Sequence, residues 1–198
     1  KPNNLFVADF VGNPAINFIE AHGHQNEKGT LDLTIFDDHE VEFCFNEPTS
    51  IAKWYEDERE QERQAKALLE KKASQKGYVE KGNKDTVFKY HVALIDEVED
   101  YGDEVVLTDD DFVLGVRPEF VEISANGRMA GEIYSSMPTG METTVRVAIG
   151  NYIVTGVMFG GVVYKLGEKT RIDFTGNEAI IFSRSTGKIV GLGSLRVK

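Results

Sequence analysis

Between residue 112 and the C-terminus, short apolar runs recur about every ten residues and are separated by glycines. Within most runs apolar and polar residues alternate, which is the period of a half-buried β-strand. This feature constrains the fold most, because short strands with Gly-rich turns at that spacing are typical of a small barrel or sandwich. The predicted strands are residues 112–116, 121–124, 131–136, 143–149, 152–158, 170–174 and 179–183.

The first 45 residues predict a short helix followed by three more strands. Asn3 and Asn4 can cap a helix that continues to Gly12, and Asn13-Pro14 then ends it. This helix is strongly apolar although nothing precedes it, so we expect the sequence to be a piece of a longer protein. Alternation predicts strands at residues 15–21, 31–36 and 40–45, and a further strand at residues 86–95.

A long polar stretch at residues 49–77 has a different character. It contains no glycine or proline before Gly77 and is rich in residues that favour helices. Its first two residues carry hydroxyl groups that can cap the helix, and Gly77 can end it. Trp54 and Tyr55 lie near its start, whereas residues 56–64 are all polar. We therefore expect the helix to dock through its N-terminal end, on the body or on a partner, and to expose its middle.

The composition excludes several classes of function. The formal net charge of −11 argues against nucleic-acid binding, which needs a clustered basic surface. No apolar run approaches the ~20 residues that span a bilayer. The single cysteine, Cys44, excludes an internal disulfide and fits a reducing compartment.

Three stretches come close to chemical motifs and depart from each template. In residues 77–85, Asn83 stands where a phosphate-binding loop needs lysine. The stretch 96–111 is rich in aspartate and glutamate, but these residues lack the ligand spacing of a calcium loop. His22-Gly-His24 is only half of a zinc pattern, and no nucleophile elbow is present. We therefore predict no catalytic, cofactor-binding or metal-binding residue in this sequence.

The corner Arg117-Pro118-Glu119 lies between two predicted strands. It could be a ligand-binding elbow or a structural corner. Proline removes a donor from the strand ladder and favours an extended residue before it. These properties favour the structural corner.

Several stretches resemble one family. Residues 4–18, NLFVADFVGNPAINF, are similar to the junction between the nucleotide-binding domain and the regulatory tail in ABC-importer ATPase subunits of the maltose and multiple-sugar class. Landmarks of the oligobinding "TOBE" segment of that family then follow in order, and the resemblance covers residues 1–45 and 112–191. The landmark residues are Gly115, Arg117, Pro118, Glu119, Gly131, Gly140, Glu142, Thr143, Gly167 and Gly187.

The resemblance implies a mainly β fold with two oligobinding-like small barrel or sandwich units, an inserted α-helix and a short N-terminal helix. Residues 1–14 would be the junction helix from a preceding ATPase domain. Residues 15–126 would form the first unit, with a helical and acidic insertion at about 47–111, by comparison with the family pattern. Residues 127–198 would form the second (TOBE) unit.

The implied function is regulation and dimerisation of the ATP-binding subunit of an importer for sugars or related solutes. ATP and magnesium would be bound by the preceding domain, so this segment would not be an enzyme by itself, although its parent would be an ATPase. The implied partners are a second copy, its own ATPase domain, membrane permease subunits and a regulatory protein. The implied location is the cytoplasmic face of the cell membrane.

A second function remains open on the residues of the segment 124–133, SANGRMAGEI. This segment partly resembles the motif in which molybdate-binding relatives cradle an oxyanion with backbone N–H groups. The arginine and asparagine are displaced from that motif, and Glu132 adds a repelling charge. The alternative is therefore a small-ligand sensor domain for an oxyanion such as molybdate.

Overall fold

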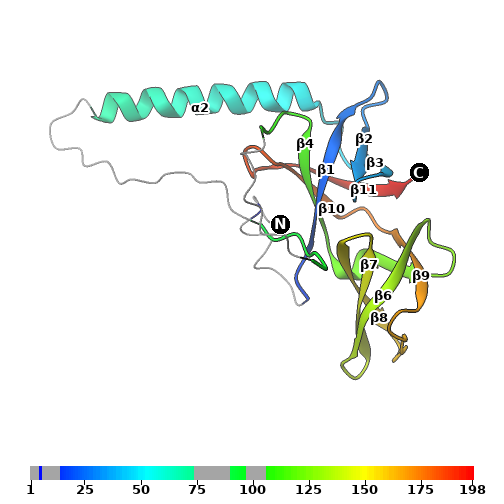
Figure 1. Cartoon of the computed structure of the whole chain (residues 1–198). Helices are drawn as coiled ribbons and strands as arrows, with labels where there is room; N and C mark the ends of the chain where they lie inside the picture. Colours follow the sequence, from blue (N-terminus) through cyan, green and yellow to red (C-terminus); the bar gives the residue numbers. More distant parts are fainter. Residues whose placement is uncertain (1–4, 6–13, 74–89, 97–105) are drawn as a thin grey trace.

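The computed structural model describes Leu5 and residues 14–73, 90–96 and 106–198, apart from the side chains of residues 71–73. The strands are β1 (Asn17–Gln25), β2 (Leu31–Ile35), β3 (His39–Phe45), β4 (Asp111–Val116), β5 (Val121–Ser124), β6 (Met129–Pro138), β7 (Glu142–Ile149), β8 (Tyr152–Phe159), β9 (Lys169–Phe174), β10 (Ala179–Ser183) and β11 (Ile189–Val197). Helix α2 (Ile51–Ala73) follows β3, and the 3-10 helix η1 (Pro118–Phe120) follows β4. The predicted mainly β fold with two small β units and a long helix is confirmed (Figure 1).

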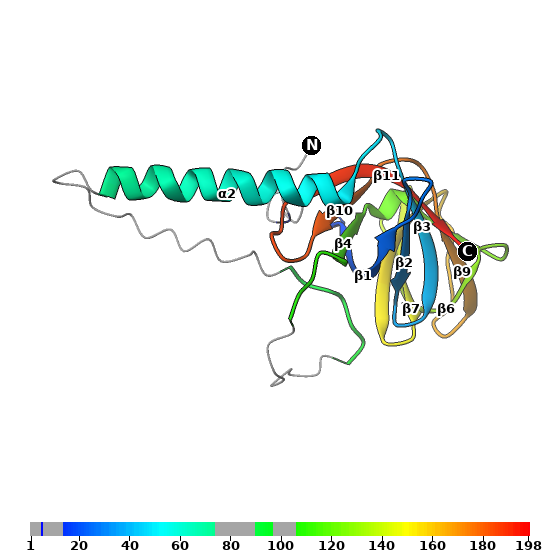
Figure 2. The same cartoon turned by 90° about the horizontal axis from the view of Figure 1, so that it is seen from above.

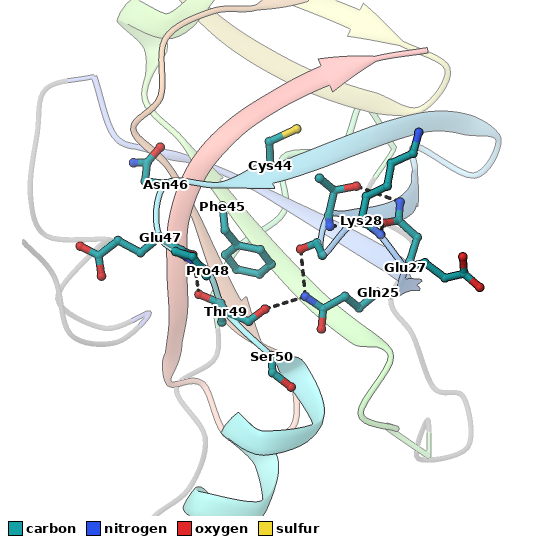
Figure 3. A pocket seen from close by; sticks show the side chains of 13 residues that line it. Gln25, Glu27, Lys28, Cys44, Phe45, Asn46, Glu47, Pro48, Thr49 and Ser50 are labelled. Atoms are coloured by element: carbon teal, nitrogen blue, oxygen red, sulfur yellow. Dashed lines mark hydrogen bonds between the residues drawn. The ribbon is translucent and has the colours of Figure 1, made fainter.

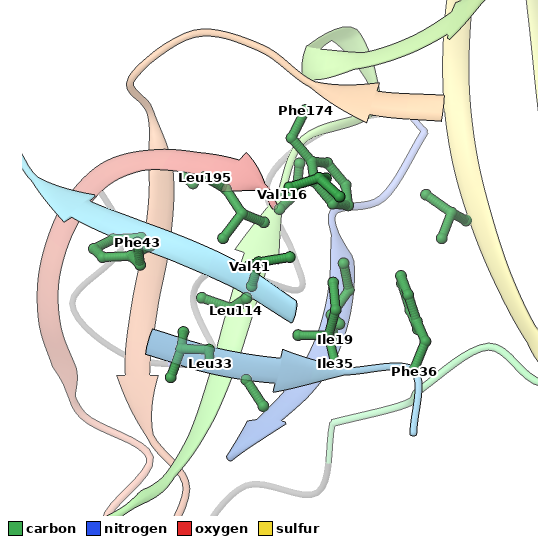
Figure 4. Close-up of a cluster of buried hydrophobic side chains, with 14 of the residues drawn as sticks. Ile19, Leu33, Ile35, Phe36, Val41, Phe43, Leu114, Val116, Phe174 and Leu195 are labelled. Carbon is green, nitrogen blue, oxygen red and sulfur yellow. The ribbon is translucent and has the colours of Figure 1, made fainter. Parts of the chain in front are cut away.

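Six strands form a closed antiparallel barrel in the order β1-β2-β3-β11-β10-β4. Alternate residues of β1, β2 and β3 point inward, as the sequence pattern predicts, and fill the barrel with large aliphatic and aromatic side chains (Figure 4). β3 and β11 approach closely at Gly193, where a Cβ atom would lie 2.2 Å from the carbonyl oxygen of Cys44. Only glycine fits at that position.

The other five strands form an antiparallel sheet in the order β5-β9-β6-β7-β8. Its buried face carries aliphatic residues from neighbouring strands, among them Ile133 of β6, Val145 and Val147 of β7, and Ile172 of β9. These side chains belong to the same buried cluster as the barrel interior. The barrel and the second sheet therefore share one hydrophobic core.

The structure divides the chain differently from the predicted units 15–126 and 127–198. β5, expected in the first unit, pairs with β9 of the second sheet. β10, expected in the second unit, pairs with β4 and β11, and β11 pairs with β3, so both strands complete the barrel. Alternation along a strand cannot reveal this, because it shows that a strand is half-buried but not which sheet it joins.

Two other predicted elements fall wholly or partly outside the described residues. Of the predicted strand at 86–95, residues 86–89 are outside, and within 90–95 only Leu94 makes a β-bridge, to Tyr152. Of the predicted junction helix, only Leu5 is described. It is fully buried, and its N–H donates to the carbonyl oxygen of Gly187 at 3.2 Å.

The predicted long helix is present as α2, which projects from one side of the barrel (Figures 1 and 2). Ser50 caps it, because its hydroxyl accepts the N–H of Lys53 at 3.4 Å. Tyr55 is buried against the barrel, and residues 56–64 are exposed except for the half-buried Glu58. The expected docking through the N-terminal end is confirmed, whereas the expected stop at Gly77 lies outside the described residues. Within the described ranges, no helix has the length and apolar character needed to cross a membrane.

Candidate interaction surface

The corner Arg117-Pro118-Glu119 carries the chain from the barrel into the second sheet. β4 ends at Val116, and Pro118 opens η1, which leads directly into β5. Pro118 is buried, and the N–H of Phe120 donates to the carbonyl oxygen of Arg117 at 2.9 Å. Arg117 and Glu119 form an ion pair, with 3.8 Å between Nη1 of Arg117 and Oε1 of Glu119, and both side chains are partly exposed. The corner has the geometry of an architectural joint.

A second joint connects the barrel to β8. The Asn17 amide donates to the carbonyl oxygen of Thr155 at 2.8 Å, and its oxygen accepts the N–H of Thr155 at 2.8 Å. The Tyr152 hydroxyl donates to Asp37 at 2.8 Å, and its ring lies 5.2 Å from that of Phe36. Burial, with the hydrogen bond to Asp37 and the charge of Asp37, raises the pKa of Tyr152 to about 12. Tyr152 therefore stays a neutral donor at physiological pH.

The remaining landmark residues do not converge on one site. Gly140, Gly167 and Gly187 adopt positive φ angles of 87°, 76° and 69° at turns. Gly115 and Gly131 lie where a Cβ atom would meet a neighbouring side chain at 2.9 Å and 2.6 Å respectively. These positions demand glycine for conformation or packing.

The last two landmarks open β7 and differ in environment. Glu142 is exposed, whereas Thr143 is fully buried. The Thr143 hydroxyl has no hydrogen-bond partner among the described residues. Glu142 belongs to no group of three His, Cys, Asp or Glu side chains that could hold a metal ion within the residues that the structure describes.

The second sheet carries a group of exposed large apolar side chains, here called the apolar surface. Its members are Tyr134, Met137, Met141, Phe159, Val162, Val163 and Leu166. Among them Met141 is 84% exposed, Leu166 73% and Phe159 66%. Strand pairing brings these segments together, because Phe159 lies opposite Glu142 and the N–H of Gly160 donates to the carbonyl oxygen of Met141 at 3.0 Å. Exposed apolar side chains that adjoin, as Phe159 and Met141 do, are a feature of interaction sites.

The β8–β9 connection holds its part of the apolar surface outward. Tyr164 packs against the buried core, while Val163 and Leu166 on either side of it are exposed. The N–H of Gly167 donates to the carbonyl oxygen of Ile133 at 2.9 Å, which fixes the connection to β6. Burial and the charge of Glu168 raise the pKa of Tyr164. The exposed residues are therefore held on an anchored loop.

No prediction from the sequence includes the apolar surface, although a signal is present. The segment 159–166 reads FGGVVYKL, which places several apolar residues between turn glycines instead of the expected polar residues. Strand alternation did not reveal it, because most of the segment lies in a connection.

In the segment proposed for an oxyanion, Arg128 and the neighbouring Arg171 of β9 bind protein groups. Arg128 donates to the carbonyl oxygen of Val197 at 2.6 Å, and Arg171 donates to the carbonyl oxygens of Gly127 and Arg128. Both guanidinium groups therefore hold protein carbonyls. Glu132 forms an ion pair with Lys169, which keeps a carboxylate beside the segment. The arrangement cross-links the second sheet and the barrel, and it is a poor anion cradle.

A pocket of about 670 Å³ lies between the β1–β2 turn and the start of α2 (Figure 3). Gln25 spans it: its amide donates to the carbonyl oxygens of Thr49 at 2.6 Å and Gly29 at 2.9 Å. Its oxygen accepts the N–H of Ile51 at 3.0 Å. These bonds hold the first turn of α2 on the barrel. The polar groups of Gln25 in this pocket therefore have a structural role.

Within the described part of the chain, no three His, Cys, Asp or Glu side chains are placed to hold a metal ion. His22 is one of the two histidines in the partial zinc pattern. Its Nδ1 lies 3.0 Å from Oδ1 of Asp111. Comparison with models of known protein families finds no match, and comparison with curated proteins finds no relative.

Proposed function

We propose that this chain is the regulatory and dimerisation domain of the ATP-binding subunit of an ABC importer for sugars or related solutes. In this proposal it takes no part in ATP hydrolysis, which belongs to a preceding domain. It acts at the cytoplasmic face of the membrane, where its parent meets permease subunits, and it offers a surface to a second copy.

The observation that carries the proposal is where the landmark residues lie in the fold. The landmark glycines occupy positive-φ turns or close contacts, and Pro118 is buried at the joint between the two β units. A family pattern is expected to preserve such conformationally demanding positions. Two small β units agree with what the resemblance implies for this domain, although β5, β10 and β11 join other units than expected.

The apolar surface supports the dimerisation part of the proposal. Its residues belong to the second sheet and its connections, and this sheet lies away from helix α2 (Figure 1). A twofold interface pairs one patch with itself, so a single self-complementary apolar surface is sufficient. The hydrogen bonds of Asn17 and Tyr152 fix the second sheet on the barrel and would present this surface rigidly.

The coding sequence upstream of Lys1 gives the first test of the proposal. We expect it to encode an ATPase domain with a phosphate-binding loop, because the resemblance begins at the junction with that domain. An unrelated domain directly before this segment would contradict the proposal.

The purified 198-residue chain gives the second test. We expect no ATP binding and no ATP turnover, because Asn83 replaces the lysine that a phosphate-binding loop needs. ATP turnover that disappears in the Lys84→Ala variant would show a nucleotide site in this segment and overturn this part of the proposal.

A further inference from the structure

Among the described residues, helix α2 contacts the barrel through its first turns. Tyr55 is buried, Glu58 forms an ion pair with Lys188, and Arg59 forms an ion pair with Asp109 at 2.5 Å. The described side chains after Arg59 are all exposed. At 1.5 Å per residue, the helix therefore extends about 20 Å past its last ion pair with the body.

The outer part of α2 carries an apolar group on the face that continues from the anchor. Ala65 and Leu69 follow Glu58 after seven and eleven residues, so they lie on the same side of the helix as Glu58, and Leu68 lies next to them, three residues after Ala65. Leu68 is 56% exposed and Leu69 51% exposed. A projecting helix of this length gains little stability from its own backbone, and its apolar face needs a partner.

The charges along α2 identify a partner. Beyond Arg59, residues 60–62 carry two acidic side chains and no basic one, whereas residues 63–73 carry four basic side chains and one glutamate. A helix segment that begins acidic and ends basic is complementary to a second copy of itself running in the opposite direction. Two such helices related by a twofold axis form a closed, self-matching contact.

We propose that the outer half of α2 pairs antiparallel with the outer half of α2 from a second copy of this chain. The axis lies between Ala65 and Leu68, so that each Ala65 meets the Leu68 of the other copy. Glu62 of each helix then lies beside the basic end of the other. The overlap leaves the anchored turns before Arg59 on their own barrel.

This pairing is separate from the apolar surface and does not rest on the proposed function. In both views α2 points away from the second sheet, so the pairing would join copies that the apolar surface does not join (Figures 1 and 2). The contact is small, and we expect it to be weaker than a standard-size interface.

Disulfide trapping between two variants tests the pairing and its direction. In a Cys44→Ser background, Ala65→Cys is mixed with Leu68→Cys under mild oxidation, and the matched control mixes Ala65→Cys with Ala67→Cys. Ala67 is one residue away, on the opposite face of the helix. We expect the 65–68 product to exceed the 65–67 product by about tenfold, because only the first pair is held together. The three trapping positions on α2 are exposed, and Cys44→Ser replaces one sulfur by oxygen in a half-buried side chain, so we expect all the variants to fold.

Each other outcome contradicts the proposal. Equal yields of the two products would indicate random collision, and 68–68 and 65–65 products in excess would indicate parallel helices. A lack of any product would mean that α2 does not pair. The same comparison in a Phe159→Ser background separates the two hypotheses, because that substitution lies in the second sheet and should leave the 65–68 product unchanged.

Discussion

The barrel and the second sheet differ in how completely they bury their large apolar side chains. Each barrel strand pairs on both sides, and none of the barrel strands carries a large exposed apolar side chain. The second sheet leaves β8 at an edge and exposes Phe159, Met141 and Leu166. The barrel is therefore complete within one copy of the chain, whereas the second sheet has a surface suited to a partner.

The largest effect should come from removing the strands that close the barrel. A chain that ends at Glu178 lacks β10 and β11 but keeps all five strands of the second sheet. We expect the barrel to lose its stable fold, because β3 and β4 would each lose a paired neighbour and much of the core. Hydrogen exchange should show fast exchange in β1–β4 of the truncated chain. Full protection of these strands would mean that the barrel does not depend on its closure.

A matched pair of substitutions compares the two regions directly. Phe112 in the barrel is fully buried, whereas Phe159 in the second sheet is 66% exposed. Phe112→Ala should lower the free energy of unfolding by about 3–5 kcal/mol, since it leaves a cavity. Phe159→Ala should change the stability of the monomer by about 0.5 kcal/mol or less. Chemical denaturation at low protein concentration measures both, and similar losses would remove the contrast between the regions.

The contact between the barrel and α2 should respond to Gln25→Ala. This change removes three hydrogen bonds and leaves the N–H of Ile51 without its side-chain acceptor. We expect a loss of about 1–2 kcal/mol, as for a partly buried group that loses its partner. The second sheet should keep its hydrogen-exchange protection while the first turn of α2 exchanges faster. A loss of protection in both regions would show that Gln25 supports the whole fold.

The smallest effect concerns acid pH and one carboxylate of the barrel. Burial opposes ionisation of Asp111, but hydrogen bonds from the N–H and hydroxyl of Thr108, together with His22, hold its pKa below the usual value. A lowered folded-state pKa stabilises the barrel above the pKa of the unfolded chain, and this stability is lost as pH falls through the folded pKa. Asp111→Asn should therefore flatten the stability profile below about pH 4. A profile identical to that of the unchanged protein would contradict this assignment.

Local structure followed from the sequence far better than the assembly of the sheets did. All the strands predicted between residues 112 and 183 are present, with ends shifted by at most two residues, because glycine turns and alternation are local signals. β11 was not predicted, since Gly191 and Gly193 weaken its pattern. The structure shows their cause: a Cβ atom at Gly191 would lie 2.9 Å from the Phe45 ring, and one at Gly193 would clash with Cys44.

The candidate surface was harder to predict than the helix contact. Trp54 and Tyr55 predicted which end of α2 contacts the barrel, because two adjacent aromatic side chains in a polar helix are expected to be buried against another surface. The exposure of Phe159 and Leu166 depends on the path of the β8–β9 connection, which Tyr164 fixes through a contact with the core. A contact between residues far apart in the fold leaves no periodic signal in one sequence.

The central claim is that the apolar surface makes the second sheet the dimer contact. Sedimentation equilibrium tests it most directly, in a chain that carries Leu68→Ser and Leu69→Ser so that α2 does not contribute. This chain should be a dimer over a wide concentration range, and adding Phe159→Ser and Leu166→Ser should convert it into a folded monomer. A chain that is monomeric throughout, or a dimer that survives all four substitutions, would contradict the claim.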